Sequence, residues 1–235
     1  MVSRAPGARS GRTGRVNATA VIAIDGPSGS GKSTVAECVA QRLDLSWLSS
    51  GALYRALTRL ALDRFGGIGP PGGLLDLMRD THWTVSGATV YAADLDLTAT
   101  LHSSEVDSLV APVSAIPAVR TAVNRTLRAR VAGGKWVVEG RDMGTEVFPD
   151  AVVKVFLDAA PDVRARRRAR QRGSAGRLAG RIAADLAERD RRDRRKPMGA
   201  LRPAADAQVI ETSHLTVTEV CDKIVAVIPT NFPPE

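Results

Sequence analysis

The chain has few aromatic residues and only two cysteines. Phe, Trp and Tyr make up 4% of its 235 residues, which disfavours a protein that binds single strands by stacking bases on aromatic rings. Cys38 and Cys221 lack the spacing of a metal site, so we expect two reduced, buried thiols in a cytosolic protein. No stretch has the uninterrupted apolar length of a membrane span. The hydrophobic content of 44% nevertheless suffices for a full core.

Acidic residues are in the minority, but the excess positive charge lies in two segments. The net charge of +8 combines +4 from residues 1–18 with +10 from residues 164–196, which leaves −6 elsewhere. A protein with a broad basic surface for nucleic acid is therefore not expected. Residues 1–18 have neither the apolar core of a signal peptide nor helical periodicity, so we expect a disordered tail. A nucleic-acid-binding arm is the alternative.

A glycine-rich segment follows the apolar run 21–24. Residues 26–34, here called the phosphate loop, fit the pattern G-x-x-x-x-G-K-[ST] at every fixed position. Such glycines let backbone N–H groups and the following helix approach a polyphosphate, whereas the alternative is a plain turn between strand and helix. Lys32 should reach the terminal phosphates, and Ser33 should bind the accompanying Mg²⁺. The predicted nucleotide-binding residues are Gly26, Pro27, Ser28, Gly29, Ser30, Gly31, Lys32, Ser33 and Thr34.

Strand-like runs alternate with helical patterns along most of the chain. We therefore expect an α/β fold with a parallel β-sheet core flanked by helices on both faces. The expected strands are 21–24, 136–139, 152–157 and 209–211. The expected helices are 32–43, 52–63, 117–131, 161–172, 176–195 and 217–227. The phosphate loop, residues 140–142 and the stretch after Asp158 follow strands, so one cleft at the carboxyl ends is expected to contain them.

The pattern changes between residues 66 and 104. Residues 66–73 are a cluster of Gly and Pro, and short strands are expected at 83–86 and 89–92 around Gly87. This segment is interpreted as a small insertion attached to the main sheet.

Two polar segments suggest a second anion site. Ser50 is expected to cap the helix that carries Tyr54 and Arg55, and this arginine could hold a phosphate with two hydrogen bonds. A capped helix with a surface arginine is the alternative. Arg141 and Asp142 lie between glycines after an apolar strand, where they would present a cation and a carboxylate to a ligand. A local ion pair in a turn is the alternative there.

A third segment is strongly basic. Helical spacing places Arg189, Asp193 and Lys196 on one face, with Arg192 also aligned with Lys196. The segment is either a solvated, salt-bridged helix or a source of cations that neutralise a phosphoryl group during transfer.

Together these motifs resemble bacterial cytidylate kinases, which are nucleoside monophosphate kinases. The resemblance extends from about residue 20 to about residue 228. It is carried by the phosphate loop, residues 50–55, 117–120 and 140–151, and by Arg189, Asp190 and Asp193.

The resemblance implies one kinase domain at 19–230, with an acceptor-binding insertion at about 66–107, a lid at about 172–192 and a tail at 231–235. It implies that Arg55 and Arg141 hold the acceptor phosphate, that Arg120 and Asp142 face the cytosine, and that Tyr54 lines the acceptor pocket. Arg189 and Asp193 would serve the lid and the sugar. The catalytic residues would be Lys32, Arg141 and Arg189, and the substrate-binding residues Ser50, Tyr54, Arg55, Arg120, Arg141, Asp142, Arg189, Asp193 and Lys196.

Five positions depart from the family pattern. The chain has Ser49 where the family usually has aspartate, His102 where it has arginine, and Ala111 where it has serine. It has Leu127 in place of glutamine and Lys196 in place of arginine. Most of these changes concern the acceptor, so a kinase of the same fold acting on another pyrimidine nucleotide or a specialised metabolite is one alternative. A nucleic-acid-binding NTPase is another, and a GTP switch is disfavoured because no guanine-recognition segment of the Asn-Lys-x-Asp kind is present.

The expected reaction is Mg²⁺-dependent transfer of the γ-phosphoryl group of ATP to CMP or dCMP. The acceptor oxygen is already anionic, so positioning and charge neutralisation suffice without a general base. His82, His102 and His214 accordingly lie outside the motifs. We expect a cytoplasmic monomer whose partners are small nucleotides, with no membrane and no nucleic acid among them.

Overall fold

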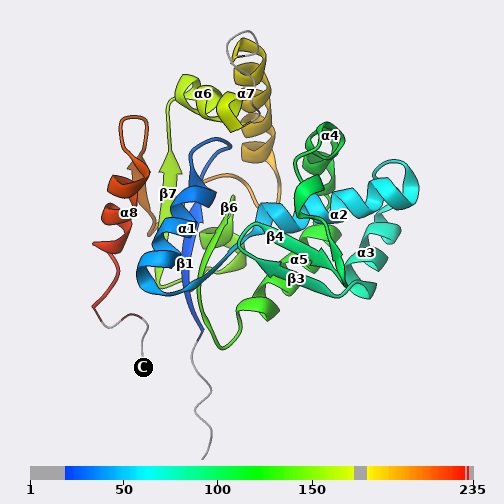
Figure 1. The fold of residues 1–235 in the computed structure, drawn as a ribbon, viewed down its shortest axis with the longest axis horizontal. Coiled ribbons are helices and arrows are strands. Elements are labelled where there is room, and N and C mark those ends of the chain that lie inside the picture. The colour runs from blue at the N-terminus through cyan, green and yellow to red at the C-terminus, as the bar shows by residue number, and fades with distance from the viewer. Residues whose placement is uncertain (1–18, 172–178, 231, 233–235) are drawn as a thin grey trace, which may run out of the picture.

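A five-stranded parallel sheet forms the centre of the computed structural model, which describes residues 19–171, 179–230 and 232 (Figure 1). Its strand order is β2-β6-β1-β7-β8, and every pairing is parallel. The strands are β1 Ala20–Asp25, β2 Ser46–Ser49, β6 Lys135–Gly140, β7 Val153–Asp158 and β8 Gln208–Glu211. The predicted fold class is confirmed, although β2 was not among the predicted strands. The four residues of β2 are too few to show the alternation of apolar and polar side chains that predicts a strand.

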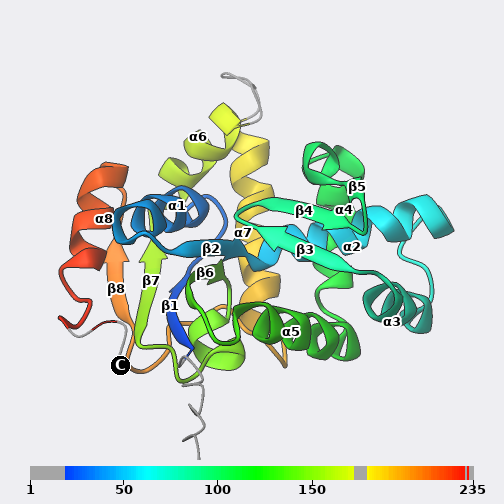
Figure 2. The same ribbon diagram turned by 60° about the horizontal axis from the view of Figure 1, so that its bottom comes forward.

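Helices cover both faces of this sheet, as Figure 2 shows. Side chains alternate along the buried strand β1, so Ile22 and Ile24 join one core cluster while Val21 and Ala23 join the other. The first cluster lies under α1 and α8, and the second under α2 and α5. These helices are α1 Lys32–Leu43, α8 Val217–Val225, α2 Ser50–Phe65 and α5 Pro117–Val131.

The start of α2 corrects one prediction. Ser49, not Ser50, is the N-cap, because its hydroxyl accepts a hydrogen bond from the backbone N–H of Ala52 at 3.2 Å. Ser50 is the first helical residue. Either serine could serve as a cap by residue type, and the end of β2 decides which one does.

The insertion contains more helix than predicted. Pro71 occupies the first turn of a helix, a position that suits its fixed φ angle, so the Gly and Pro cluster does not exclude helical structure. The two predicted strands are present, and a short third strand pairs with the second. The elements are α3 Pro71–Asp80, β3 Trp83–Ser86, β4 Thr89–Ala92, β5 Leu95–Asp96, a 3₁₀ turn Thr98–Thr100 and α4 Ser104–Val113.

The turn between β3 and β4 joins the insertion to the edge of the main sheet. The backbone N–H of Gly87 donates to the carbonyl of Trp47 at 2.7 Å, and that of Ser49 donates to the carbonyl of Gly87 at 2.9 Å. Gly87 has a φ of +59°, and a Cβ atom there would lie 2.9 Å from the Trp47 ring. A side chain would therefore disturb this connection.

Helices α6 Pro161–Gln171 and α7 Ala179–Arg195 pack together beyond the carboxyl end of β7 (Figure 1). They share a small core of Ala165, Ala169, Ile182 and Leu186. The predicted positions 172 and 176–178 lie outside the described residues, as do the tail 1–18 and most of the tail 231–235. In the described ranges no single helix has the length and apolar composition to cross a membrane; α4 and α5 meet that test only as a pair bent by 101°.

The prediction of two buried thiols is half right. Both cysteines are free, Cys221 is buried in α8, and Cys38 in the neighbouring α1 is partly exposed. Burial raises the pKa of the Cys221 thiol to about 12, and a hydrogen bond with Cys38 adds to the shift.

Candidate active site

The phosphate loop adopts the backbone that its glycines predict. Gly29 and Gly31 have φ angles of +80° and +95°. A Cβ atom on Gly26 would lie 2.1 Å from the carbonyl oxygen of Leu157, and one on Gly29 would lie 2.9 Å from that of Arg164. Any other residue at Gly26 or Gly29 would therefore displace the loop from β7 or α6.

Lys32 lies buried beneath this loop. Its Nζ donates a hydrogen bond to the carbonyl oxygen of Pro27 at 2.8 Å. Burial and then the positive charge of Arg141 lower the pKa of Lys32 to about 7, against the opposing effect of the Glu139 and Asp25 carboxylates. A polyphosphate in the loop would supply the negative charge that this ammonium group needs.

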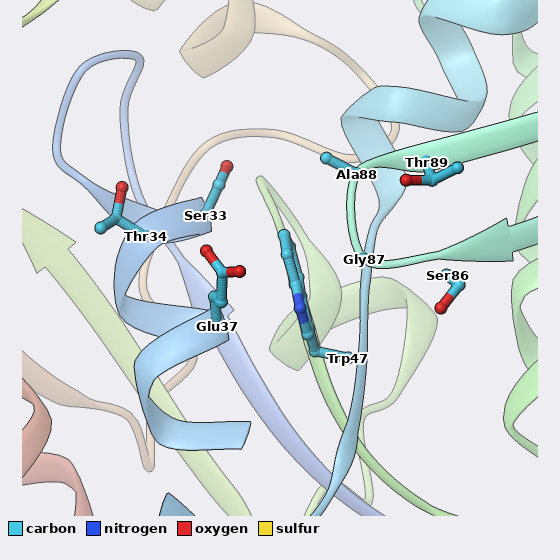
Figure 3. A pocket seen from close by; sticks show the side chains of 8 residues that line it. All are labelled: Ser33, Thr34, Glu37, Trp47, Ser86, Gly87, Ala88 and Thr89. Atoms are coloured by element: carbon cyan, nitrogen blue, oxygen red, sulfur yellow. The ribbon is translucent and has the colours of Figure 1, made fainter. Parts of the chain in front are cut away.

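Ser33 is the predicted metal-binding residue, and its hydroxyl has a carboxylate partner. Ser33 Oγ donates to Glu139 Oε1 at 3.0 Å, and Ser49 Oγ donates to the same oxygen. Ser33 and Glu37 of α1, together with Trp47, border a cavity of about 390 Å³ whose far wall is the β3–β4 turn (Figure 3). Glu139 is the last residue of a predicted strand and was not predicted as a site residue. Its position at the carboxyl end of a buried strand was the available signal.

Asp25, at the end of β1, is a second carboxylate that the predictions missed. It accepts hydrogen bonds at 2.8 Å from the backbone N–H groups of both Met143 and Gly144. Burial raises its pKa to about 6, although these two hydrogen bonds lower it. Asp25 thereby fixes the segment after Asp142 as a π-helical turn, Met143–Val147, which was not among the predicted elements.

The predicted helix face Arg189–Asp193–Lys196 is present and meets Arg141. Asp193 contacts Lys196 at 2.7 Å, Arg141 at 3.1 Å and Arg189 at 4.0 Å. Burial would raise the pKa of Asp193, but the charges of Arg141 and Lys196 outweigh it and hold this pKa at about 2. Arg141 also donates to the carbonyl oxygen of Gly26 at 3.1 Å, so it connects α7 with the phosphate loop. Arg192 lies apart from this cluster and pairs with Glu188.

Arg120 and Asp142 form a buried ion pair. Arg120 Nη2 donates to Asp142, and Nη1 donates to the carbonyl oxygen of Ser114 at 3.1 Å. The Arg120 guanidinium lies 5.7 Å from the centre of the Tyr54 ring. Gly199 has a φ of +69°, and a Cβ atom there would lie 1.9 Å from this guanidinium. The glycine thus leaves the space that Arg120 occupies.

Arg55 is held by the insertion. It contacts Asp107 at 2.7 Å and donates to the carbonyl oxygen of Leu101 at 2.8 Å. Arg168 of α6 also contacts Asp107, at 3.2 Å. This aspartate therefore connects α2, α4 and α6 at the predicted acceptor-phosphate site. Ser50 is buried nearby, with its hydroxyl 2.5 Å from the position of a Cβ atom on Gly140.

Two further arginines reach the phosphate loop, and neither was predicted. Arg164 pairs with Asp190 of α7 and donates to the carbonyl oxygen of Ser28 at 3.2 Å. Arg167 donates to the carbonyl oxygens of Ser30 at 3.3 Å and Thr212 at 2.7 Å. In the sequence both belong to a run of arginines in which nothing distinguishes them.

The residues fit a polyphosphate, a second anion and Mg²⁺. Several buried side-chain atoms in the described part of the chain have no hydrogen-bond partner: Tyr54 Oη, Arg120 Nε, Asn124 Oδ1, Thr145 Oγ1 and Arg189 Nε. Three belong to predicted substrate-binding residues. Among the described residues no group of three or more His, Cys, Asp or Glu could hold a metal. Mg²⁺ that accompanies a triphosphate is held mainly by phosphate oxygens and water, and the Ser33 hydroxyl would add one ligand.

Three of the five positions that depart from the family pattern lie in the core or away from the phosphate loop and the Asp193 cluster. Leu127 is buried among apolar side chains, His102 is exposed, and Ala111 is partly buried on α4, where its carbonyl accepts from Ser114. Lys196 keeps a cation beside Asp193, and Ser49 contacts Glu139.

The fold and this site define a kinase built on a phosphate-binding loop. Its insertion and its arginine-rich helix α7 contribute the carboxylates that Arg55 and Arg141 contact. The chain belongs to the cytidylate kinase family, whose model matches residues 22–230. The family that the motifs suggested is thereby confirmed.

Individual relatives agree with this assignment. The cytidylate kinase from Thermus thermophilus is 43% identical to the chain, and the match covers 88% of the chain and 97% of that enzyme. The cytidylate kinase from Methylococcus capsulatus is 40% identical, and the match covers 88% of the chain and 96% of that enzyme. A bifunctional pantoate ligase/cytidylate kinase from a Synechococcus species is 42% identical over 214 residues, and the chain spans 40% of its length. The crystal structure of an uncharacterized protein from Eubacterium ventriosum matches with a TM-score of 0.51 and 15% sequence identity. The match covers 89% of this chain and 98% of that one, and it shows a similar fold only.

Proposed function

We propose that the chain transfers the γ-phosphoryl group of ATP to the phosphate of CMP, forming ADP and CDP. The observation that carries this proposal is the position of Arg141. It contacts the carbonyl oxygen of Gly26 in the phosphate loop and the carboxylate of Asp193 in α7, and it is followed by Asp142 of the Arg120 pair. One cation thus stands between the donor loop and the acceptor residues. The cytidylate kinase relatives support the same reaction.

On the donor side, the backbone N–H groups of the phosphate loop and the ammonium group of Lys32 bind the triphosphate. The hydroxyl of Ser33 would hold Mg²⁺, which when bound neutralises phosphate charge and aligns the reacting groups. Arg164 and Arg167 keep the loop in position through their bonds to its carbonyl oxygens.

On the acceptor side, Arg55 and Arg141 bind the phosphate of CMP. Arg55 would exchange Asp107 for that phosphate as its partner, because both anions can present two oxygens to a guanidinium group. Arg120 offers N–H donors and Asp142 offers acceptor oxygens, a pair that can match the N3 and amino group of cytosine. The free hydroxyl of Tyr54 lies beside Arg120 and completes this pocket.

The attacking oxygen is part of a phosphate and needs no general base. Catalysis then consists of aligning two phosphates and neutralising the charge on the transferred group with Lys32, Arg141 and Arg189. Burial, and then the charge of Arg141, lower the pKa of Arg189 to about 10, so this arginine stays charged at neutral pH. We further propose that the kinase domain spans 19–230 and works as a monomer in the cytoplasm.

A coupled assay of ADP release tests the acceptor. With ATP and Mg²⁺, the highest kcat/KM is expected for CMP in a panel that also contains dCMP, UMP, AMP and GMP. The variant Lys32→Ala should lose activity about a hundredfold or more and keep its fold, because it removes one preorganised cation. A purine nucleotide or UMP as the best acceptor would contradict the proposal.

A further inference from the structure

Ser49 lies where β2 ends and α2 begins, and it has two partners. Its hydroxyl oxygen accepts a hydrogen bond from the N–H of Ala52, and its proton is donated to Glu139. Ser49 and Glu139 are also paired in register on the neighbouring strands β2 and β6. Both side chains are buried, with 6% and 5% of their surface exposed. The geometry of this contact is therefore set by the sheet.

Glu139 links Ser49 to Ser33. The same oxygen, Oε1, accepts from Ser33 Oγ at 3.0 Å and from Ser49 Oγ. The two hydroxyls come from different elements, one on the helix after the phosphate loop and the other at the start of the helix that carries Arg55. A side chain held by two such donors has little rotational freedom left.

The proton of Ser33 determines what its hydroxyl can bind. A serine hydroxyl has one proton and two lone pairs, so donation to Glu139 leaves the lone pairs for a cation. Groups that orient a metal-binding side chain in this way affect metal affinity although they do not touch the metal. Ser33 also borders the cavity in Figure 3, which leaves space on its exposed side.

We infer that Ser49 is a positioning residue for the metal-binding hydroxyl of Ser33. It fixes Glu139, Glu139 orients the Ser33 hydroxyl, and the same serine caps the acceptor-binding helix α2. Serine adds no charge beside Glu139, whereas an aspartate at this position would place a second carboxylate next to it. This inference rests on the proposed donor site and extends it to a residue that touches neither nucleotide.

The test compares Mn²⁺ binding by variants of the whole chain. Mn²⁺ is titrated into each protein saturated with ATP, and free Mn²⁺ is followed by electron paramagnetic resonance. Ser49→Ala should weaken the Mn²⁺ affinity of the complex about tenfold. Ser49→Thr keeps both the hydroxyl and the cap, so its affinity should stay within about twofold of the parent. The Mg²⁺ concentration for half-maximal turnover should shift in parallel.

Two further variants separate positioning from capping. Ser49→Gly removes the hydroxyl, but glycine is tolerated at an N-cap, so this variant should fold and still lose Mn²⁺ affinity like the alanine variant. Thr216→Ala removes the N-cap of α8, a helix on the far side of the core from α2. It should lower the unfolding temperature without changing Mn²⁺ affinity.

Parental Mn²⁺ affinity in Ser49→Gly and Ser49→Ala would overturn the inference and leave Ser49 as a cap alone. Failure of the proposed function has a different outcome. If the parent binds Mn²⁺ with ATP and the Ser49 variants lose affinity while CMP is not phosphorylated, the acceptor assignment is wrong and the inference stands. If the parent binds no Mn²⁺ in the presence of ATP, the donor site and the inference are both wrong.

Discussion

At the scale of single residues, Lys32 shows how burial prepares a charge for a ligand. Its ammonium group donates to the carbonyl oxygen of Pro27, and burial and the charge of Arg141 lower its pKa to about 7. A bound triphosphate would replace this single carbonyl partner with several negatively charged oxygens. Binding and protonation of Lys32 are therefore expected to be coupled.

This coupling predicts proton uptake. At about pH 8 most Lys32 side chains are neutral in the free protein, and ATP should raise the pKa so that a proton is bound with the nucleotide. At about pH 6 the group is already charged, so uptake should be small. Calorimetric titration with ATP in two buffers of different ionisation enthalpy measures the proton count. In Lys32→Met the uptake at about pH 8 should disappear; an unchanged count in this variant would assign the proton elsewhere.

The Arg120–Asp142 pair predicts a large loss of stability from a single substitution. Asp142→Ala leaves a buried guanidinium without its carboxylate and should lower the free energy of unfolding by about 3 to 5 kcal/mol. Asp162→Ala removes an exposed aspartate from its pair with Arg166 and should lower the free energy of unfolding far less, because water screens this pair. Urea titrations of both variants measure these values. Equal costs would show that Asp142 contributes no more than a surface pair does.

At the scale of secondary-structure elements, α6 and α7 are tied to the phosphate loop by side chains rather than by the sheet. Arg164 of α6 and Asp190 of α7 pair with each other, and each contacts the backbone of Ser28, the aspartate accepting from its N–H at 3.4 Å. We therefore expect a change at the loop to affect both helices. We expect ATP to stabilise them.

Asp190→Asn tests this connection. The substitution removes the charge that partners buried Arg164, so amide exchange in 179–195 should accelerate and kcat should fall about tenfold or more. Asp185→Asn, at an exposed position of the same helix, should leave both quantities unchanged. Hydrogen exchange with mass spectrometry reads the helix, and the ADP-release assay reads kcat. Parental exchange in Asp190→Asn would refute a role for this pair in holding α7.

Predictability from sequence also differs among elements. The phosphate loop, β1, α1 and α5 have strong local patterns and lie close to their predicted ranges. In contrast, β2 and the π-helical turn Met143–Val147 depend on partners distant in sequence, namely Glu139 and Asp25. Long-range hydrogen bonds of this kind leave no periodic trace in the chain. The N-cap of α2 was misplaced by one residue for the same reason.

At the scale of the whole molecule, the structure shows which partners the basic segment 164–196 has. Much of its charge is paired: Arg164 with Asp190, Arg168 with Asp107, and Arg192 with Glu188. The composition alone could not show this, because the carboxylates come partly from other elements. Asp107, which holds Arg55 and Arg168, joins the insertion to α6 and was likewise invisible in the sequence. Arg164 and Arg167 reach the phosphate loop and Arg168 reaches Asp107, whereas Arg166 and Arg192 form exposed pairs within their own helices.

The fate of the labelled phosphate in a single turnover tests the central claim most directly. ATP radiolabelled on its γ-phosphate is mixed with excess protein, Mg²⁺ and CMP, the reaction is quenched, and the nucleotides are separated. The account predicts that the label appears in the β-phosphate of CDP, with Lys32→Ala slower by about a hundredfold or more. Label found in inorganic phosphate, or in another nucleotide when a mixture of acceptors is offered, would contradict it.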